Sequence, residues 1–239
     1  MTYDMLNDMN TVFPSDKSEC EKIAKCSSEI DNLFTLHQRK PLLTIKIIFP
    51  WEQRKLGEVA IGFDYVLNAA ATDYDGKNKY VRITDIDDET HLFNADGLTS
   101  PDTDLSNAEN YKLSEGDVLF ARTGASVGKT YKYTVSDGDV YFAGFLIRAK
   151  VKPEYDAEFV FQNTLTDNYD KFIRITSQRS GQPGVNAQEY QSFEIMAPKY
   201  EEQRRIGRFF RNLDNLITLH QRINKKNIGG LINEHSVSQ

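Results

Sequence analysis

The stretch EEQRRIGRFFRNLDNLITLHQRI, residues 201–223, decides the expected fold because it returns elsewhere in the chain. Residues 18–40, SECEKIAKCSSEIDNLFTLHQRK, align with it without gaps at a constant offset of 183. The polar phrase HQR recurs in both copies, although packing alone requires only the apolar positions. The repeat therefore predicts two similar elements near opposite ends of the 239-residue chain, with surfaces that something else recognises.

Apolar residues recur every three or four positions in both copies, which predicts amphipathic helices. The positions expected to pack on a partner are Ile206, Phe210, Leu213, Leu216 and Ile217 in the second copy, and Ile30 and Leu33 in the first. A helix of about 22 residues is marginal alone and needs a partner for its apolar stripe. We expect the two copies to form an antiparallel, coiled-coil-like pair, and pairing with helices of another chain remains the alternative.

Composition suits a protein outside the membrane. No apolar run approaches the roughly 20 residues of a membrane helix, and the N-terminus lacks the pattern of a secretory signal. The two cysteines, Cys20 and Cys26, form neither a CxxC motif nor a disulfide framework, so we interpret them as reduced thiols of a cytoplasmic protein.

The net charge of −6 argues weakly against nucleic acid but hides an asymmetry. Residues 62–110 carry eleven acids and three bases, net −8, whereas residues 199–226 carry eight bases and three acids, net +5. Because the local field governs phosphate binding, a moderately acidic chain can still present basic surface.

Between the two copies, the sequence indicates a mixed domain of the α+β class. Strands are expected in 79–87, 117–122, 129–135, 140–151 and 193–198, which are rich in β-branched and aromatic residues. Helices are expected in 55–60 and in 156–174, where apolar residues have helical spacing. Strands and helices do not alternate regularly, so a doubly wound sheet is not expected.

One candidate site is the glycine-bearing segment RTGASVGKT, residues 122–130. It is not a nucleotide-binding phosphate loop: Thr123 stands where that motif requires its first glycine, and a strand-like segment follows instead of a helix. The segment still carries basic residues and no acid. Its two glycines would also let the backbone come close to a ligand. Its candidate DNA-contacting residues are Arg122, Thr123, Ser126, Lys129 and Lys132.

A second candidate site is the polar segment KFIRITSQRSGQPGVNAQ, residues 171–188, which carries three bases and no acid. Arg and Gln make bidentate contacts to base edges, and Lys and Ser suit phosphates. Its candidates are Arg174, Ser177, Gln178, Arg179, Ser180, Gln182 and Asn186. The alternative is a solvated loop between a helix and a strand.

No pattern indicates catalysis or a metal site. The four histidines, His37, His91, His220 and His235, show neither HExxH nor Cys/His ligand spacing, and no G-x-S-x-G is present. The acidic stretch TDIDDETHLFNAD, residues 84–96, lacks the glycine and terminal glutamate of a calcium loop, so we interpret it as a solvated acidic turn.

Several stretches resemble the specificity subunit of type I restriction-modification systems. They are WEQRKLGEVA at 51–60, KYVRITDID at 79–87, LSEGDVLFARTGASVGKTY at 113–131, and the run from SGQPGVNAQEYQ at 180–191 into the helix ending LHQR at 222. The resemblance implies a target-recognition domain that reads one half of a split DNA sequence. It also implies conserved helices that set the half-site spacing and bind methyltransferase subunits, which hold S-adenosylmethionine. The chain itself is expected to be non-catalytic and to bind no cofactor.

The chain departs from the full family pattern, which has two recognition domains. We expect a remnant tail at 1–18, a first conserved helix at 19–45, one recognition domain at 46–198, a second conserved helix at 199–230 and a flexible tail at 231–239. The expected partners are double-stranded DNA and methyltransferase subunits, with the restriction subunit and a second copy of this chain left open. The alternative function is a decoy, regulator or degraded remnant that binds the methyltransferase and no longer reads DNA.

Overall fold

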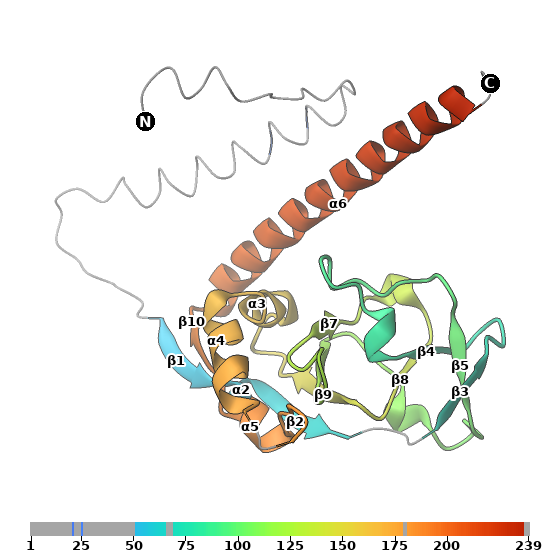
Figure 1. Cartoon of the computed structure of the whole chain (residues 1–239). Coiled ribbons are helices and arrows are strands. Elements are labelled where there is room, and N and C mark those ends of the chain that lie inside the picture. Colours follow the sequence, from blue (N-terminus) through green and yellow to red (C-terminus); the bar gives the residue numbers. More distant parts are fainter. Residues whose placement is uncertain (1–20, 22–24, 26–50, 66–68, 179–180, 237–239) are drawn as a thin grey trace, which may run out of the picture. The chain divides into compact units, whose positions relative to one another are not determined.

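The computed structural model describes residues 51–65, 69–178 and 181–236, together with Glu21 and Lys25, and for 221–236 it describes only the course of the helix. The centre of the domain is a four-stranded antiparallel sheet in the order β2-β9-β6-β7. Figure 1 labels β2, β9 and β7 of this sheet. Its strands are β2 (Ala60–Asp64), β9 (Leu146–Val151), β6 (Asp117–Ala121) and β7 (Thr130–Lys132). The middle strand β6 is buried on both faces, as its continuous apolar run predicts.

Three two-stranded sheets surround this centre. They are β1 (Glu52–Lys55) with β10 (Glu194–Ala197), β3 (Ala70–Asp73) with β5 (Thr99–Asp102), and the parallel pair β4 (Lys79–Val81) with β8 (Val140–Phe142). Pairing of β1 with β10 brings the start and the end of the domain together. The mixture of several small sheets with separate helices confirms the expected α+β class.

The core lies on both faces of the central sheet because side chains alternate along each strand. Val118 and Phe120 of β6 join one apolar cluster, which includes Phe159, Tyr169, Tyr190 and Phe193. Leu119 and Ala121 point the other way, into a cluster with Tyr131, Phe142 and Leu146. Burial on both faces holds β6 in place, and the first candidate site begins directly after its last residue, Ala121.

Four α-helices and three 3₁₀ turns complete the domain before the long helix. The α-helices are α2 (Leu56–Val59), α3 (Ala157–Asn163), α4 (Asp167–Thr176) and α5 (Ala187–Gln191), and the 3₁₀ turns are η2 (Ile83–Asp85), η3 (Glu109–Tyr111) and η4 (Val135–Asp137). The helical pattern at 156–174 gives two helices rather than one. Thr166 is the N-cap of α4, and its hydroxyl accepts from the Tyr169 amide at 3.4 Å, so a new helix begins there.

The expected C-terminal helix is present as α6 (Tyr200–Ser236), whose 37 residues span roughly 55 Å. Residues Ile48–Arg211 form one compact unit, so α6 begins within that unit and continues beyond it. The expected first helix at 19–45, including Ile30 and Leu33, lies outside the described residues except for Glu21 and Lys25, which are helical and exposed. Over the described part of the chain, no helix is long and apolar enough to span a membrane.

The beginning of α6 is joined to α3 by a buried glutamine and a glycine. Gln203 is 2% exposed; its amide donates to the Pro198 carbonyl at 2.8 Å and its Oε1 accepts from the Asp156 amide at 3.1 Å. A Cβ at Gly207 would lie 2.7 Å from Asp156 Oδ1 and 2.9 Å from the Phe159 nitrogen. The absent side chain therefore lets α6 approach the backbone of α3 closely.

We expect Gly207→Ala to lower the free energy of unfolding by about 1–2 kcal/mol, because overpacking against backbone outweighs the gain in helix propensity. Chemical denaturation measures this change. Arg208→Ala, at an exposed position of the same turn, is the control and should be near neutral. Equal stability of the two variants would contradict the close approach of α6 to α3.

Candidate nucleic-acid interface

The two candidate segments, far apart in the sequence, lie side by side in the structure. Thr123 forms an antiparallel bridge with Gly184, the Gly124 amide donates to the Pro183 carbonyl at 3.1 Å, and the Val185 amide donates to the Arg122 carbonyl at 2.9 Å. We call the surface formed by residues 122–129 and by the described residues of 174–186 the loop-pair surface. Backbone bonds thus bring the described parts of the two candidate segments together on one part of the domain.

The turn at 122–129 depends on glycine at two positions. Gly124 and Gly128 have φ of +80° and +90°, a region that side-chain-bearing residues rarely adopt. Hydrogen bonds from the Gly128 amide to the Ala121 carbonyl, and from the Ala121 amide to the Lys129 carbonyl, close the turn at 3.0 and 2.8 Å. Strand β7 follows it, so the segment lacks the helix that a nucleotide-binding phosphate loop aims at its ligand.

Two buried tyrosines hold this turn from beneath. The Tyr169 hydroxyl donates to the Gly128 carbonyl at 2.9 Å, and the Tyr190 hydroxyl donates to the Ala121 carbonyl at 2.6 Å. Burial raises the pKa of both phenols, so they stay protonated and keep donating at neutral pH. The turn is therefore a preformed feature supported by the core.

The predicted site residues differ in how much of them a ligand could reach. Arg174, Gln178, Gln182 and Asn186 are exposed, Arg122, Thr123 and Ser126 are partly buried, and Ser177 is buried. Arg179 and Ser180 lie outside the described residues. Asn186 is also the N-cap of α5: its Oδ1 accepts from the Glu189 amide at 3.0 Å, so its side chain stabilises a helix end.

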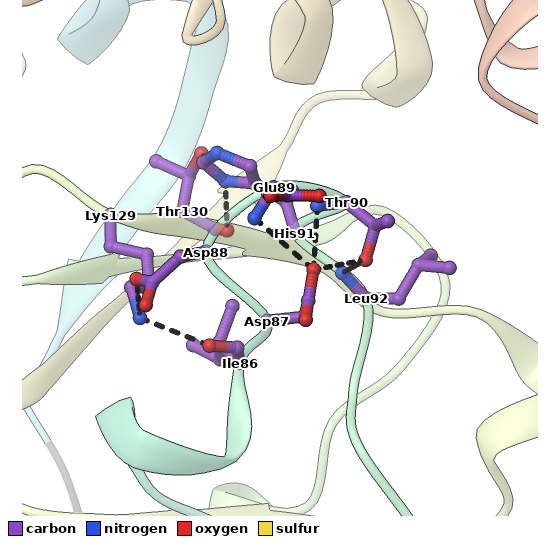
Figure 2. Close-up of polar contacts among 9 residues, drawn as sticks. All are labelled: Ile86, Asp87, Asp88, Glu89, Thr90, His91, Leu92, Lys129 and Thr130. Carbon is purple, nitrogen blue, oxygen red and sulfur yellow. Dashed lines mark hydrogen bonds and ion pairs between the residues drawn. The ribbon is translucent and has the colours of Figure 1, made fainter. Parts of the chain in front are cut away.

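Lys129 has an intramolecular role, which Figure 2 shows. Its ammonium donates to the Ile86 carbonyl at 3.0 Å and forms an ion pair with Asp88, and its side chain is only 10% exposed. The hydrogen bond and the ion pair of Lys129 thus connect the acidic turn at 84–96 to the glycine turn at 122–129. Because carbonyl oxygens only accept, His91 Nδ1 carries the proton that it donates to the Thr130 carbonyl at 2.8 Å, which adds a second link.

Lys132 is likewise engaged within the domain. Its ammonium lies 3.3 Å from Glu158 Oε2, and the two side chains are 15% and 9% exposed. That oxygen makes no directed hydrogen bond, so the contact is mainly one between charges. Both lysines of the first candidate site therefore have carboxylate partners inside the chain.

Two aromatic residues that the sequence did not single out adjoin Arg122. The Arg122 guanidinium lies over the Tyr65 ring, 5.5 Å from its centroid, and the Tyr65 hydroxyl accepts from the Ala187 amide at 3.2 Å. The Arg122 amide donates to the Phe145 carbonyl at 2.9 Å. The signal for Phe145 was Gly144, which interrupts the apolar run at 140–151 and marks a turn between β8 and β9.

Arg122 also keeps donor capacity for a ligand. Its Nε is buried and out of reach of a ligand, which leaves the two terminal nitrogens as donors. Among the residues that the structure describes, its guanidinium has no carboxylate partner. Arg174 is exposed, and no carboxylate in the same described ranges pairs with it. The unpaired positive charge of the loop-pair surface therefore resides on arginines.

The packing residues predicted on α6 fall into two groups. Ile206 is partly buried against the domain core. Leu213 and Leu216 are partly buried, whereas Phe210 is 43% and Ile217 is 55% exposed. Seven residues separate Phe210 from Ile217, which places them two turns apart on one face. Within the described ranges, no group of three or more His, Cys, Asp or Glu side chains could hold a metal ion.

The fold is that of type I restriction-modification specificity subunits. The S subunit from M. genitalium matches with a TM-score of 0.55 and 15% identity over 88% of this chain and 50% of that chain. A chain from a structure of complex assembly and conformational transition in a type I system matches with a TM-score of 0.52 and 14% identity, over 92% and 57%. The chain thus spans about half the length of these solved chains.

The family model described as the type I restriction modification DNA specificity domain matches residues 49–226, and the chain belongs to this family. No curated protein matches it significantly. Specificity subunits of the family are non-catalytic and serve target recognition in restriction-modification.

Proposed function

We propose that this chain reads one half of a bipartite DNA sequence within a type I restriction-modification complex. In this proposal, residues 46–198 are the recognition domain and 199–230 the conserved helix that follows it. Membership in the DNA specificity family supports the general role. The observation that carries the proposal is the backbone pairing of the two candidate segments, Thr123 with Gly184 and Gly124 with Pro183, which gathers exposed polar side chains on one surface.

The residues of the loop-pair surface divide into readers and positioning groups. Gln178 and Gln182 are exposed and carry the donor and acceptor that an adenine edge requires. Arg174, also exposed, supplies charge toward a phosphate, and Thr123 and Ser126 supply hydroxyls. Because Lys129 and Lys132 already have carboxylate partners, we assign them a role in stabilising the domain rather than in contacting DNA. Arg179 and Ser180 keep the role predicted from the sequence.

The partners follow from α6. Phe210 and Ile217 expose apolar surface on one face of the helix, which fits docking of methyltransferase subunits, the holders of S-adenosylmethionine. Pairing of α6 with the similar segment at 18–40 would build the antiparallel helix pair, and a second copy of the chain would supply the other half-site reader through two-fold symmetry. The restriction subunit would join through the methyltransferase.

A selection experiment tests the recognition role. The full chain with a methyltransferase subunit is incubated with a randomised duplex library, and the retained duplexes are sequenced. We expect a half-site consensus. Gln182→Ala should lower affinity for that consensus by about 1–2 kcal/mol and leave random DNA almost unaffected. Arg174→Ala should weaken both alike and reduce the salt slope by about one.

Ser136→Ala, at an exposed position of η4 outside the loop-pair surface, is the control and should change neither quantity. Equal losses on consensus and random DNA for Gln182→Ala would assign the loop to backbone positioning. Retention of the methyltransferase subunit without selection of any sequence would favour the decoy or regulator function over the DNA-reading one.

A further inference from the structure

Three residues from separate parts of the chain converge at one end of the loop-pair surface. Tyr65 follows β2, Arg122 follows β6, and Phe145 lies between β8 and β9. Arg122 joins them, because its guanidinium lies over the Tyr65 ring and its amide donates to the Phe145 carbonyl. The Arg122 carbonyl in turn accepts from Val185, which makes this trio continuous with the two candidate loops.

Phe145 is exposed in a way that the packing of the domain does not require. The residue is 58% exposed, whereas its neighbour Leu146 is fully buried in the core. Single exposed apolar residues are common on protein surfaces and alone carry no message. Here the backbone of the exposed residue accepts a hydrogen bond from Arg122, an arginine without a carboxylate partner among the described residues, just beyond the paired residues Ala121 and Leu146 of β6 and β9. The surface belongs to a DNA specificity domain.

The nearby acid does not oppose an anionic ligand at this place. Asp64, next to Tyr65 in the chain, pairs with Arg148 at 2.7 Å. The Arg122 side chain is held by its Tyr65 contact, and with Nε buried the terminal nitrogens are the donors left for a ligand. An arginine fork of this kind suits the O6 and N7 acceptors of guanine in the major groove.

We infer that Phe145 contacts the 5-methyl group of a thymine adjacent to a guanine bound by Arg122. This inference rests on the proposed function and deepens it by naming the base chemistry that one end of the surface reads. Phenylalanine matches the thymine methyl, the apolar group on the major-groove edge of the standard bases. Tyr65 acts through Arg122 and is a positioning residue.

The test compares thymine with uracil, which differs from it by that methyl group. The full chain with a methyltransferase subunit first selects its consensus from the randomised library. Phe145→Ala is then selected in the same way and should lose the preference for thymine at one position while keeping the others. At that position, replacing thymine by uracil should weaken wild-type binding about fourfold, the value of one buried methyl group.

The Phe145→Ala variant should bind the thymine and uracil duplexes equally. The four affinities form a double-mutant cycle that measures the interaction between Phe145 and the methyl group. Val135→Ala removes a side chain that is 69% exposed elsewhere, in η4, and should respond to uracil like the wild type. Phe145→Leu, which keeps an apolar side chain, should retain part of the thymine preference. Thermal denaturation of each variant checks that the domain is folded.

An unchanged consensus for Phe145→Ala, or the same uracil penalty in the variant and the wild type, would overturn the inference while leaving DNA reading intact. A uniform loss at all positions would also overturn it, because it would show that Phe145 supports the turn and does not read a base. If the wild-type complex selects no consensus, the proposed function itself fails.

Discussion

Gly128→Ala is expected to lower the free energy of unfolding by about 3–4 kcal/mol, because two penalties combine at this position. The residue has a φ of +90°, and a Cβ would lie 2.8 Å from Ile173 Cγ2 and 2.9 Å from Cγ1. The clash would displace the glycine turn from α4, and with it the segment that bonds to Pro183 and Gly184. Denaturant titration measures stability, and half-site selection should show weakened discrimination.

Two other glycines separate the penalties. Gly97 has a φ of +73° with nothing within 4 Å of an added Cβ, so Gly97→Ala isolates the backbone strain. Gly62 has open space and no such φ, so Gly62→Ala should be close to neutral. In the Ile173→Ala background, Gly128→Ala should cost less stability, because the steric clash is removed and only the backbone strain remains. A Gly128→Ala variant no less stable than Gly97→Ala would contradict the packing of Ile173 on the turn.

Lys132→Met is expected to lower the free energy of unfolding by about 3 kcal/mol, because it leaves the Glu158 carboxylate buried without its charge partner. Glu158 is 9% exposed at its side chain and Lys132 is 15% exposed. Adding Glu158→Gln should restore most of the stability, since no unpaired charge remains. Denaturant titration of the two single variants and the double variant measures the coupling.

The same variants decide whether Lys132 also contacts DNA. If it only supports the domain, the double variant should bind random DNA with an unchanged salt dependence. A phosphate contact would instead reduce the salt slope by about one in Lys132→Met and in the double variant alike. A stable Lys132→Met with a reduced slope would restore the role predicted from the sequence.

In the proposed function, arginines take a larger part in DNA contact than the lysines predicted from the sequence. Lysine after a glycine turn suggests a mobile point charge for phosphate, but Lys129 and Lys132 end on Asp88 and Glu158. Arg122 and Arg174 have no such carboxylates among the described residues. If the loop-pair surface contacts DNA as proposed, arginine and glutamine would make the planar, bidentate contacts that carry sequence discrimination.

Much of the fold was accessible from local pattern. The apolar stripe at 201–223 predicted α6, because apolar residues spaced three and four apart are typical of an amphipathic helix. The run at 117–122 predicted β6, and the polar segments at 122–130 and 171–188 were identified as candidate sites. The break between α3 and α4 was missed because the apolar spacing continues through it, although Thr166 is a good N-cap.

Only the tertiary structure decided how those pieces meet. Contacts between residues distant in the sequence pair Thr123 with Gly184, Lys129 with Asp88, and the backbone of Arg122 with that of Phe145. Secondary structure and family character arise from neighbouring residues, so a sequence determines them directly. Whether a charged side chain stays available for DNA depends on long-range strand pairing and on which carboxylates it brings near, and no local pattern contains that information.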